Sequence, residues 1–553
     1  MYERAPGAAV IGERLYRVVA AHRPFFSFVT TIGWGPTTQP STYAVANWFF
    51  LRGLGLVYLI AFLSLALQIR GLVGHDGILP AREYMAAARG WADAHQLGLD
   101  RLRVLPTLAW FDTSDAFLEG LSVGGAALAS LLILGVAPAL LLPLLWVGYL
   151  SLAVVCRDFL SYQWDALLLE TGFLAIFVAP LVRWDRFRRI VDPPRVAVWL
   201  LWFLLFRLMF GSGIVKLASG DPTWRTLTAL TFHFETQPLP TPAAWYAHQL
   251  PRWCQQGSTL LVLGIELAVP WLIFAPRRLR AIGGTLLVSL QGLIGLTGNY
   301  AFFNPLSTVL CLLLFDDTAL TRLAAVLRTR IRVAKAAPAH ALRWPSSVLV
   351  AVGFLTVPPS VEALTRECGV RLWGAATLAP LVHLIQPFRS VNAYGLFAIM
   401  STTRLEIVVE GSNDGVTWLA YEFTDKPGEE RRRPSWVAPH QPRLDWQMWF
   451  AALGSYEDSA WFERFCRRLL EGSPSVLRLL ARDPFDGTPP LFVRGALYRY
   501  RFADAATNRT QGVWWVREHL GLYSPAWSLE RGAARGSALR SPIPTAAVRA
   551  ALH

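Results

Sequence analysis

The sequence predicts a polytopic α-helical membrane bundle of about nine crossing helices, followed by a C-terminal β-rich domain. Three observations support this fold class. The 553 residues are 54% hydrophobic and 16% charged, with a mean hydropathy of +0.36, whereas soluble globular chains carry about 25% charged residues. Long apolar runs recur up to about residue 390. Beyond that point the pattern changes to the period of two that is typical of strands.

Nine apolar runs define the expected crossings, because roughly 20 helical residues span a 30 Å hydrocarbon core. A continuous run over 121–155 is too long for one perpendicular crossing at about 1.5 Å per residue. We divide it at residues 135–138, Gly-Val-Ala-Pro, since proline lacks a backbone donor and glycine tolerates a turn. The other runs are residues 47–69, 166–182, 196–218, 258–275, 281–298, 306–315 and 346–364.

Basic residues are distributed unevenly between the two sets of loops, which predicts an orientation. The N-terminal arm and the loops 183–195, 276–280 and 316–345 hold 18 Lys and Arg residues, against 8 in the opposite loops. The sequence therefore predicts a cytoplasmic arm (residues 1–46), a transmembrane domain (47–389) and a C-terminal domain (390–553) outside the cytoplasm.

The composition and the motifs of the sequence also indicate which partners and cofactors to expect. The net charge of +14 comes mostly from Arg residues between apolar runs, without a nucleic-acid-binding motif, so a lipid bilayer is the expected partner and nucleic acid is not. The chain has no HExxH, GxGxxG or Walker A motif, and we expect neither a cofactor nor a metal site. Its five cysteines form no CxxC pair and are expected to be free thiols.

Strand signals dominate the C-terminal domain. Residues 404–410 and 416–423 are rich in β-branched and aromatic side chains, and the Gly-bounded link 411–415 between them predicts a β-hairpin. Residues 491–502 predict another strand, while 446–453 and 461–470 are more typical of helices. We expect a sandwich-like arrangement with helical insertions.

The charged residues Glu170, Arg207, Lys216 and Glu266 lie within the apolar runs. Charged groups in the membrane usually face the bundle interior, where they are paired or functional. Arg207 and Glu266 lie near the middles of their runs, which predicts a midplane ion pair. Glu170 and Lys216 lie near the outer ends and are expected to share a level. A packing role is favoured, and a catalytic role stays open as the alternative.

A set of motifs extends along residues 44–527. It includes Asn-Trp-Phe-Phe-Leu-Arg-Gly at 47–53, Gly-Ile-Leu-Pro at 77–80, Tyr-Gln-Trp-Asp at 162–165, Phe-His-Phe-Glu-Thr-Gln-Pro-Leu-Pro at 232–240, Trp-Gln-Met-Trp-Phe-Ala-Ala-Leu-Gly at 446–454 and Leu-Tyr-Arg-Tyr-Arg-Phe at 497–502. Together these motifs resemble the lipase maturation factor family.

That resemblance implies a membrane-anchored, chaperone-like factor, which favours a function other than catalysis and leaves an enzyme open. Its expected client is a secreted protein such as a lipase, contacted by the C-terminal domain. In that family the membrane is that of the endoplasmic reticulum. The Arg-, Ala- and Leu-rich composition is typical of a GC-rich bacterial genome, in which case the equivalent would be the plasma membrane.

Two other functions remain open at this stage. Gly-Ile-Val-Lys-Leu at 213–217, followed by Trp224, resembles more weakly the segment of vitamin K-dependent γ-carboxylases that carries their catalytic lysine. This implies a quinone-linked intramembrane enzyme that uses Lys216, with Glu170 as a second reactive group. A transporter is the other alternative, because buried charges also mark carriers, although a carrier needs no large exposed domain.

Overall fold

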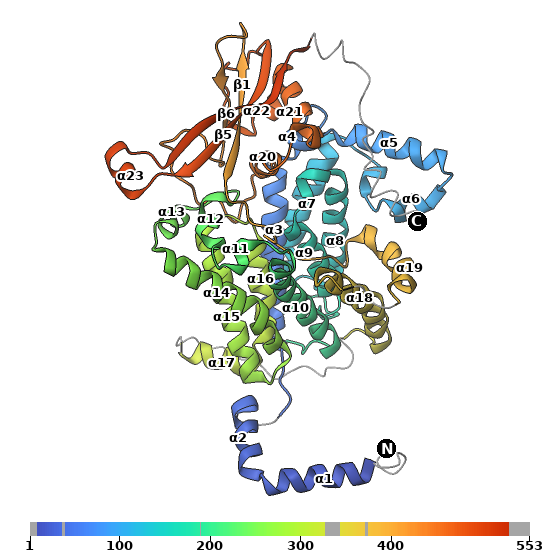
Figure 1. Cartoon of the computed structure of the whole chain (residues 1–553). Helices are drawn as coiled ribbons and strands as arrows, with labels where there is room; N and C mark the ends of the chain where they lie inside the picture. Colours follow the sequence, from blue (N-terminus) through green and yellow to red (C-terminus); the bar gives the residue numbers. More distant parts are fainter. Residues whose placement is uncertain (1–7, 36–38, 188–189, 327–342, 371–373, 530–553) are drawn as a thin grey trace.

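The computed structural model describes residues 8–35, 39–187, 190–326, 343–370 and 374–529 (Figure 1). Long helices form a bundle in the middle of the molecule, and a β-sheet lies at one end of it. The N-terminal helices α1 (Ala8–Ala21) and α2 (Arg23–Trp34) lie beyond the opposite end.

Each of the nine predicted runs contains a helix, although the run 166–182 is helical only to Ala175, and within the described ranges seven helices are long and apolar enough to cross a membrane. These are α3 (Ala44–Ala66), α7 (Asp115–Leu134), α8 (Pro138–Val155), α10 (Arg195–Ala218), α14 (Arg252–Ala268) with η5 (Val269–Phe274), α15 (Arg277–Thr297) and α18 (Ser346–Glu367). The other two are shorter: α9 (Gln163–Ala175), and α16 (Phe303–Cys311) with η6 (Leu312–Leu314). The predicted polytopic membrane bundle is therefore confirmed.

The division of the long run at residues 135–138 is also confirmed. Helix α7 ends where Gly135 adopts a left-handed φ of 84°, and Pro138 occupies the first position of α8. A Cβ atom at Gly135 would lie 2.7 Å from the backbone oxygen of Asp185, so only glycine fits this turn without displacement. The turn makes α7 and α8 packed neighbours.

Short helices fill the connections between the long ones. Between α3 and α7 lie α4 (Ile69–Val73), α5 (Ala81–Ala94), η1 (Gly98–Asp100), α6 (Arg101–Val104) and η2 (Leu108–Trp110). Between α10 and α14 lie α11 (Pro222–Arg225), α12 (Ala229–Thr236) and α13 (Pro242–His248). The remaining ones are η3 (Arg157–Leu160), α17 (Asp317–Val326), α19 (Ala375–Ile385) and η8 (Gln386–Phe388). In Figure 1, α11–α13 lie at the end of the bundle that faces the sheet.

The C-terminal domain contains a four-stranded antiparallel sheet in the order β2-β1-β5-β6. Its strands are β1 (Arg404–Ser412), β2 (Leu419–Ala420), β5 (Phe492–Phe502) and β6 (Trp515–Trp527). A two-stranded sheet pairs β3 (Glu422–Phe423) with β4 (Leu480–Arg482). The predicted hairpin is confirmed, because Glu410 of β1 pairs with Ala420 of β2. The predicted strand over 491–502 is confirmed as β5.

Helices cover one face of this sheet. The predicted helices are α20 (Arg443–Ala452) and α21 (Ala460–Leu470), which pack against β1 and β5 respectively. Phe462 of α21 lies 3.2 Å from the position that a Cβ of Gly495 would take. The shorter elements are η9 (Tyr456–Asp458), α22 (Pro474–Leu477) and α23 (Ala505–Gln511). A β domain is thus confirmed, but its second layer consists largely of helices, because the apolar stripe of α21 covers the sheet where a sandwich would have a second sheet.

The main hydrophobic core continues from the bundle into the C-terminal domain. One cluster of buried apolar side chains contains Phe50 and Tyr149 from the membrane helices together with Trp446, Phe462 and Ile407 from the C-terminal domain. The two parts therefore share a core, which continues across the junction between them.

Candidate functional site at the junction of the bundle and the C-terminal domain

Buried ion pairs are formed by the four charged residues singled out above, Glu170, Arg207, Lys216 and Glu266. Arg207 pairs with Glu170, and the Lys216 Nζ atom lies 2.6 Å from a carboxylate oxygen of Glu266. The prediction that Arg207 pairs with Glu266 is therefore wrong, as is the shared level of Glu170 and Lys216.

The ion-pair partners differ from those predicted because α10 and α14 are offset along their axes. Lys216 lies two residues from the C-terminal end of α10, whereas Glu266 lies fourteen residues into α14. The start of α14 must therefore extend past the end of α10, which the intervening helices α11–α13 allow. Arg207 precedes Lys216 by nine residues, or roughly 13 Å along the helix, and reaches Glu170 on the short helix α9. Two residues at similar positions in different apolar runs therefore need not lie at the same depth in the bundle.

The Glu170–Arg207 pair holds the chain segment that leads into the C-terminal domain. The backbone N–H of Asn392 and the hydroxyl of Tyr394 donate to Glu170 at 2.9 and 2.8 Å, and Arg207 donates to the Asn392 carbonyl at 2.9 Å. Glu367 accepts from the backbone N–H of Tyr394 at 2.6 Å. The buried charges thus anchor a strap of backbone between α9, α10 and α18.

The Lys216–Glu266 pair is enclosed by protein groups. The Lys216 ammonium group also donates to the Ser212 carbonyl at 2.9 Å and lies 5.2 Å from the centre of the Trp224 ring. A Cβ at Gly213 would lie 2.9 Å from the Glu266 side chain, so the two helices approach closely here. This geometry favours the packing interpretation of Lys216.

A buried ion pair that the sequence analysis missed joins the bundle directly to the C-terminal domain. Asp165 of α9 and Arg443 of α20 both have side chains that are 0% exposed. The Arg443 guanidinium donates to both carboxylate oxygens at 3.1 Å, and the Tyr149 hydroxyl donates to the same carboxylate. Bidentate pairs of this kind fix orientation as well as distance. The signal was Asp165 in the motif at 162–165, close to the start of α9.

Hydrogen bonds surround this Asp165–Arg443 pair. The Trp164 indole N–H donates to the Gln441 side chain at 2.8 Å, and the backbone N–H of Arg443 donates to the Gln68 side chain at 2.9 Å. The rings of Trp164 and Trp446 meet edge to face at 4.7 Å. Ser64 of α3 accepts from the backbone N–H of Gln441 at 3.0 Å, so helices α3, α9 and α20 are fixed together at this first junction.

A second junction links the sheet to the α12–α13 segment. Arg404 of β1 is buried, pairs with Glu406 at 2.6 Å and donates to the backbone carbonyls of Glu235 and Pro238 at 2.8 Å. The indole N–H groups on this face also cross the boundary, from Trp449 to Thr236 and from Trp245 to Ala503, both at 2.9 Å. The C-terminal domain is thus held at two separate places on the bundle.

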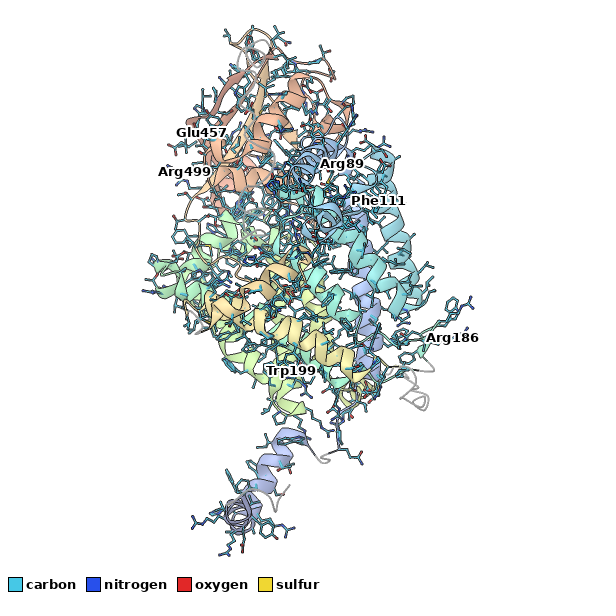
Figure 2. The ribbon with its side chains drawn as sticks, turned by 90° about the vertical axis from the view of Figure 1, so that its right-hand side faces the viewer. Arg89, Phe111, Arg186, Trp199, Glu457 and Arg499 are labelled. Carbon is cyan, nitrogen blue, oxygen red and sulfur yellow. The ribbon has the colours of Figure 1, made fainter. Side chains whose placement is uncertain are left out.

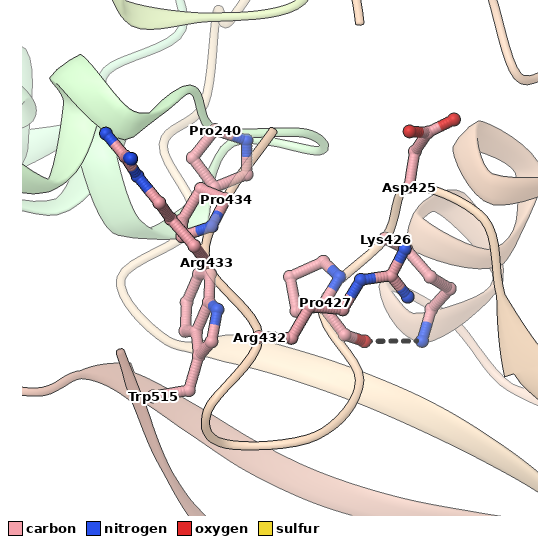
Figure 3. Close-up of a pocket in the computed structure, with 8 residues that line it drawn as sticks. All are labelled: Pro240, Asp425, Lys426, Pro427, Arg432, Arg433, Pro434 and Trp515. Atoms are coloured by element: carbon pink, nitrogen blue, oxygen red, sulfur yellow. Dashed lines mark hydrogen bonds between the residues drawn. The ribbon is translucent and has the colours of Figure 1, made fainter. Parts of the chain in front are cut away.

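A small pocket opens beside the second junction (Figure 3). Its volume is about 220 Å³, including space open to solvent. It is lined by Pro240, Asp425, Lys426, Pro427, Arg432, Arg433, Pro434 and Trp515. The basic groups are engaged by the protein itself: Lys426 pairs with Glu406 at 2.8 Å and Arg432 donates to the Phe423 carbonyl. The pocket is a gap where the C-terminal domain packs against the chain around Pro240, here called the seam.

Burial near this seam also perturbs a carboxyl group. It raises the pKa of Asp445 on α20 to about 6, although backbone N–H groups of Asp425 and Lys426 donate to it at 2.7 and 2.8 Å and act in the opposite direction. Asp445 therefore ties the 425–426 loop to the helix that carries Arg443.

Breaking the first junction is expected to destabilise the whole protein. Arg443→Met leaves the Asp165 carboxylate buried without its cation, which costs about 3–5 kcal/mol. The melting temperature in lipid nanodiscs should fall clearly. The matched control is Arg499→Met, which removes an exposed pair with Glu518 and should cost at most about 1 kcal/mol. Equal melting temperatures for the two variants would contradict the role of the buried pair.

The packing interpretation of Lys216 predicts different outcomes for two substitutions. Lys216→Ala leaves Glu266 buried without a cation and should lower the amount of protein in the membrane several-fold. Lys216→Arg keeps a cation and should retain more protein. Quantitative immunoblotting of membrane fractions measures both, with the exposed Arg225→Ala as control. Equal amounts of the Ala and Arg variants would argue against this interpretation.

Comparison with known proteins covers both parts of the chain. The profile of the lipase maturation factor transmembrane domain matches residues 45–322, and that of the lipase maturation factor C-terminal domain matches residues 390–525. No solved structure gives a significant match.

Individual relatives agree with these profiles. Lipase maturation factor 2 of Gallus gallus is 39% identical over 87% of this chain and 81% of its own length. The human protein of the same name is 38% identical over 87% and 82%. Lipase maturation factor 1 of Bos taurus is 35% identical over 89% and 90%. These matches show that the chain belongs to the lipase maturation factor family.

Proposed function

We propose that this chain is a membrane-anchored, chaperone-like maturation factor for secreted lipases and that its C-terminal domain contacts the client. Family membership supports the activity, since the relatives are named for lipase maturation. The observation that carries the role of the C-terminal domain is its fixed attachment to the bundle through Asp165 and Arg443. A domain mounted in this way presents its far end to a client at a constant distance from the membrane.

That far end carries exposed apolar side chains. Val416 is 82% exposed and Leu491 is 60% exposed, and Leu419 lies near them on β2. Leu491 is beside the hairpin turn, because its backbone N–H donates to the Asn413 side chain at 3.3 Å. We call Val416, Leu419 and Leu491 the apolar tip. An incompletely folded lipase exposes apolar segments of its own, which is the chemistry that such a surface binds.

The length of β1 determines how far the apolar tip lies from the second junction. Arg404 at the first residue of β1 is fixed to the bundle, and the strand continues for nine residues to Ser412. At about 3.4 Å per residue, the hairpin turn lies roughly 27 Å from the junction. The sheet in Figure 1 extends away from the bundle in this direction.

Replacing the apolar tip tests the client-contact proposal. Val416→Ser, Leu419→Ser and Leu491→Ser together should leave the amount and melting temperature of the protein nearly unchanged, because exposed substitutions usually change stability by less than about 0.5 kcal/mol. The activity of a co-expressed secreted lipase, divided by its secreted mass, should fall several-fold. Leu453→Ser with Leu520→Ser, which are also exposed in this domain, is the matched control.

Two outcomes separate the contact surface from the function. Normal lipase activity with the tip variant would show that the client binds elsewhere. Unchanged lipase activity after removal of the whole chain from the cell would contradict the maturation function itself. Truncation before residue 443 is a poorer test, since it would leave Asp165 buried without Arg443.

We also propose that the N-terminal arm is cytoplasmic and that the C-terminal domain lies outside the cytoplasm. The excess of basic residues in the loops 183–195, 276–280 and 316–345 supports this orientation. Figure 2 locates Arg186, from one of these loops, toward the end of the bundle opposite Glu457 and Arg499 of the C-terminal domain.

Cysteine labelling measures this orientation directly. Glu457→Cys and Arg186→Cys both replace exposed side chains. In intact cells a membrane-impermeant thiol reagent should label position 457, and it should label position 186 only after permeabilisation. Labelling of 186 but not 457 in intact cells would reverse the topology.

The lysine-dependent enzyme and the transporter are not proposed. The family match accounts for both parts of the chain, and the Lys216 ammonium group is held by Glu266 and Ser212.

A further inference from the structure

We infer that residues 98–111, here called the interfacial loop, lie in the headgroup region of the bilayer on the side of the C-terminal domain. The loop comprises η1, α6, η2 and Phe111. It joins α5 to the chain that enters the membrane as α7. Its partner is the lipid surface of the bilayer in which the bundle sits.

The exposed side chains of the interfacial loop are those of a membrane-surface element. Leu99 of η1 is 81% exposed, Leu102 of α6 is 38% exposed and Phe111 is 77% exposed. Arg101 and Arg103 alternate with these apolar residues. Apolar side chains interleaved with arginines suit the boundary between acyl chains and headgroups, where both kinds are satisfied.

Chain continuity places the loop at that depth. Phe111 precedes Asp115, the first residue of the membrane-crossing helix α7, by four residues, which span at most about 14 Å. In Figure 2, Phe111 lies toward the end of the bundle near the C-terminal domain, while Trp199 lies toward the other end. Trp253, the second residue of the crossing helix α14, is also exposed near the C-terminal-domain end. Exposed aromatic residues at the ends of crossing helices are typical of the headgroup level.

The interfacial loop is also connected to the C-terminal domain. Arg89 of α5 donates to the Trp110 carbonyl at 3.0 Å, which holds the loop against α5. At the start of α5, Glu83 pairs with Arg464 of α21 at 2.6 Å, and Gly77 accepts from Arg468 at 2.9 Å. The loop therefore supports the C-terminal domain from the membrane surface, beside the two junctions.

Spin-label accessibility tests this placement in the full-length protein. Leu99→Cys and Leu102→Cys are labelled separately with a nitroxide in phosphatidylcholine nanodiscs. The background carries Cys254→Ser and Cys368→Ser, since these two of the five free cysteines are partly exposed. Leu261→Cys on the exposed face of α14 is the lipid reference, and Glu457→Cys is the aqueous reference.

We expect oxygen to relax labels 99 and 102 more strongly than a water-soluble nickel chelate does, as at position 261. Position 457 should show the opposite preference. If labels 99 and 102 match position 457, the loop lies in water and the inference is overturned. Label mobility at 99 and 102 gives a second readout, because partial immersion should restrict it relative to position 457.

Discussion

The Asp165–Arg443 pair joins two parts of the chain that are 278 residues apart. A carboxylate and a guanidinium can be buried away from water only when each is paired and hydrogen-bonded. The reason is that moving an isolated charge out of water has a large free-energy cost. Tyr149 and the carbonyl of Phe159 supply the further hydrogen bonds. Docking of α20 is thereby restricted to one position, and the sheet packed on α20 inherits that position.

The same constraint explains the intramembrane charges. Glu170 binds Arg207 and also backbone of the 390–394 strap, so the charge pair within the bundle fixes the segment that leads to β1. At the start of β1, Arg404 donates hydrogen bonds to the backbone carbonyls of Glu235 and Pro238 and so attaches the sheet to the bundle. Three buried cations, Arg207, Arg443 and Arg404, thus hold the C-terminal domain to the bundle at successive points along the chain.

Features with a local cause could be predicted from the sequence. The turn at Gly135 and Pro138 follows from backbone chemistry, the hairpin from a Gly-bounded link, and the crossing helices from the length of apolar runs. The ion-pair partners could not be predicted in this way, because the depth of Glu266 depends on how far α14 extends past α10. Strand β6 was missed because three irregularities in its pairing with β5 interrupt the simple alternation of side chains.

The two junctions have a mechanical consequence for the bundle. The first junction holds α3 through Ser64 and α9 through Asp165, and the second holds the α12–α13 segment that leads into α14. One rigid sheet domain therefore bridges helices from the early and the late part of the bundle. Carriers work by rocking one such group of helices against the other. Any such rocking here would have to separate a desolvated charge pair, which favours a fixed arrangement of the helices.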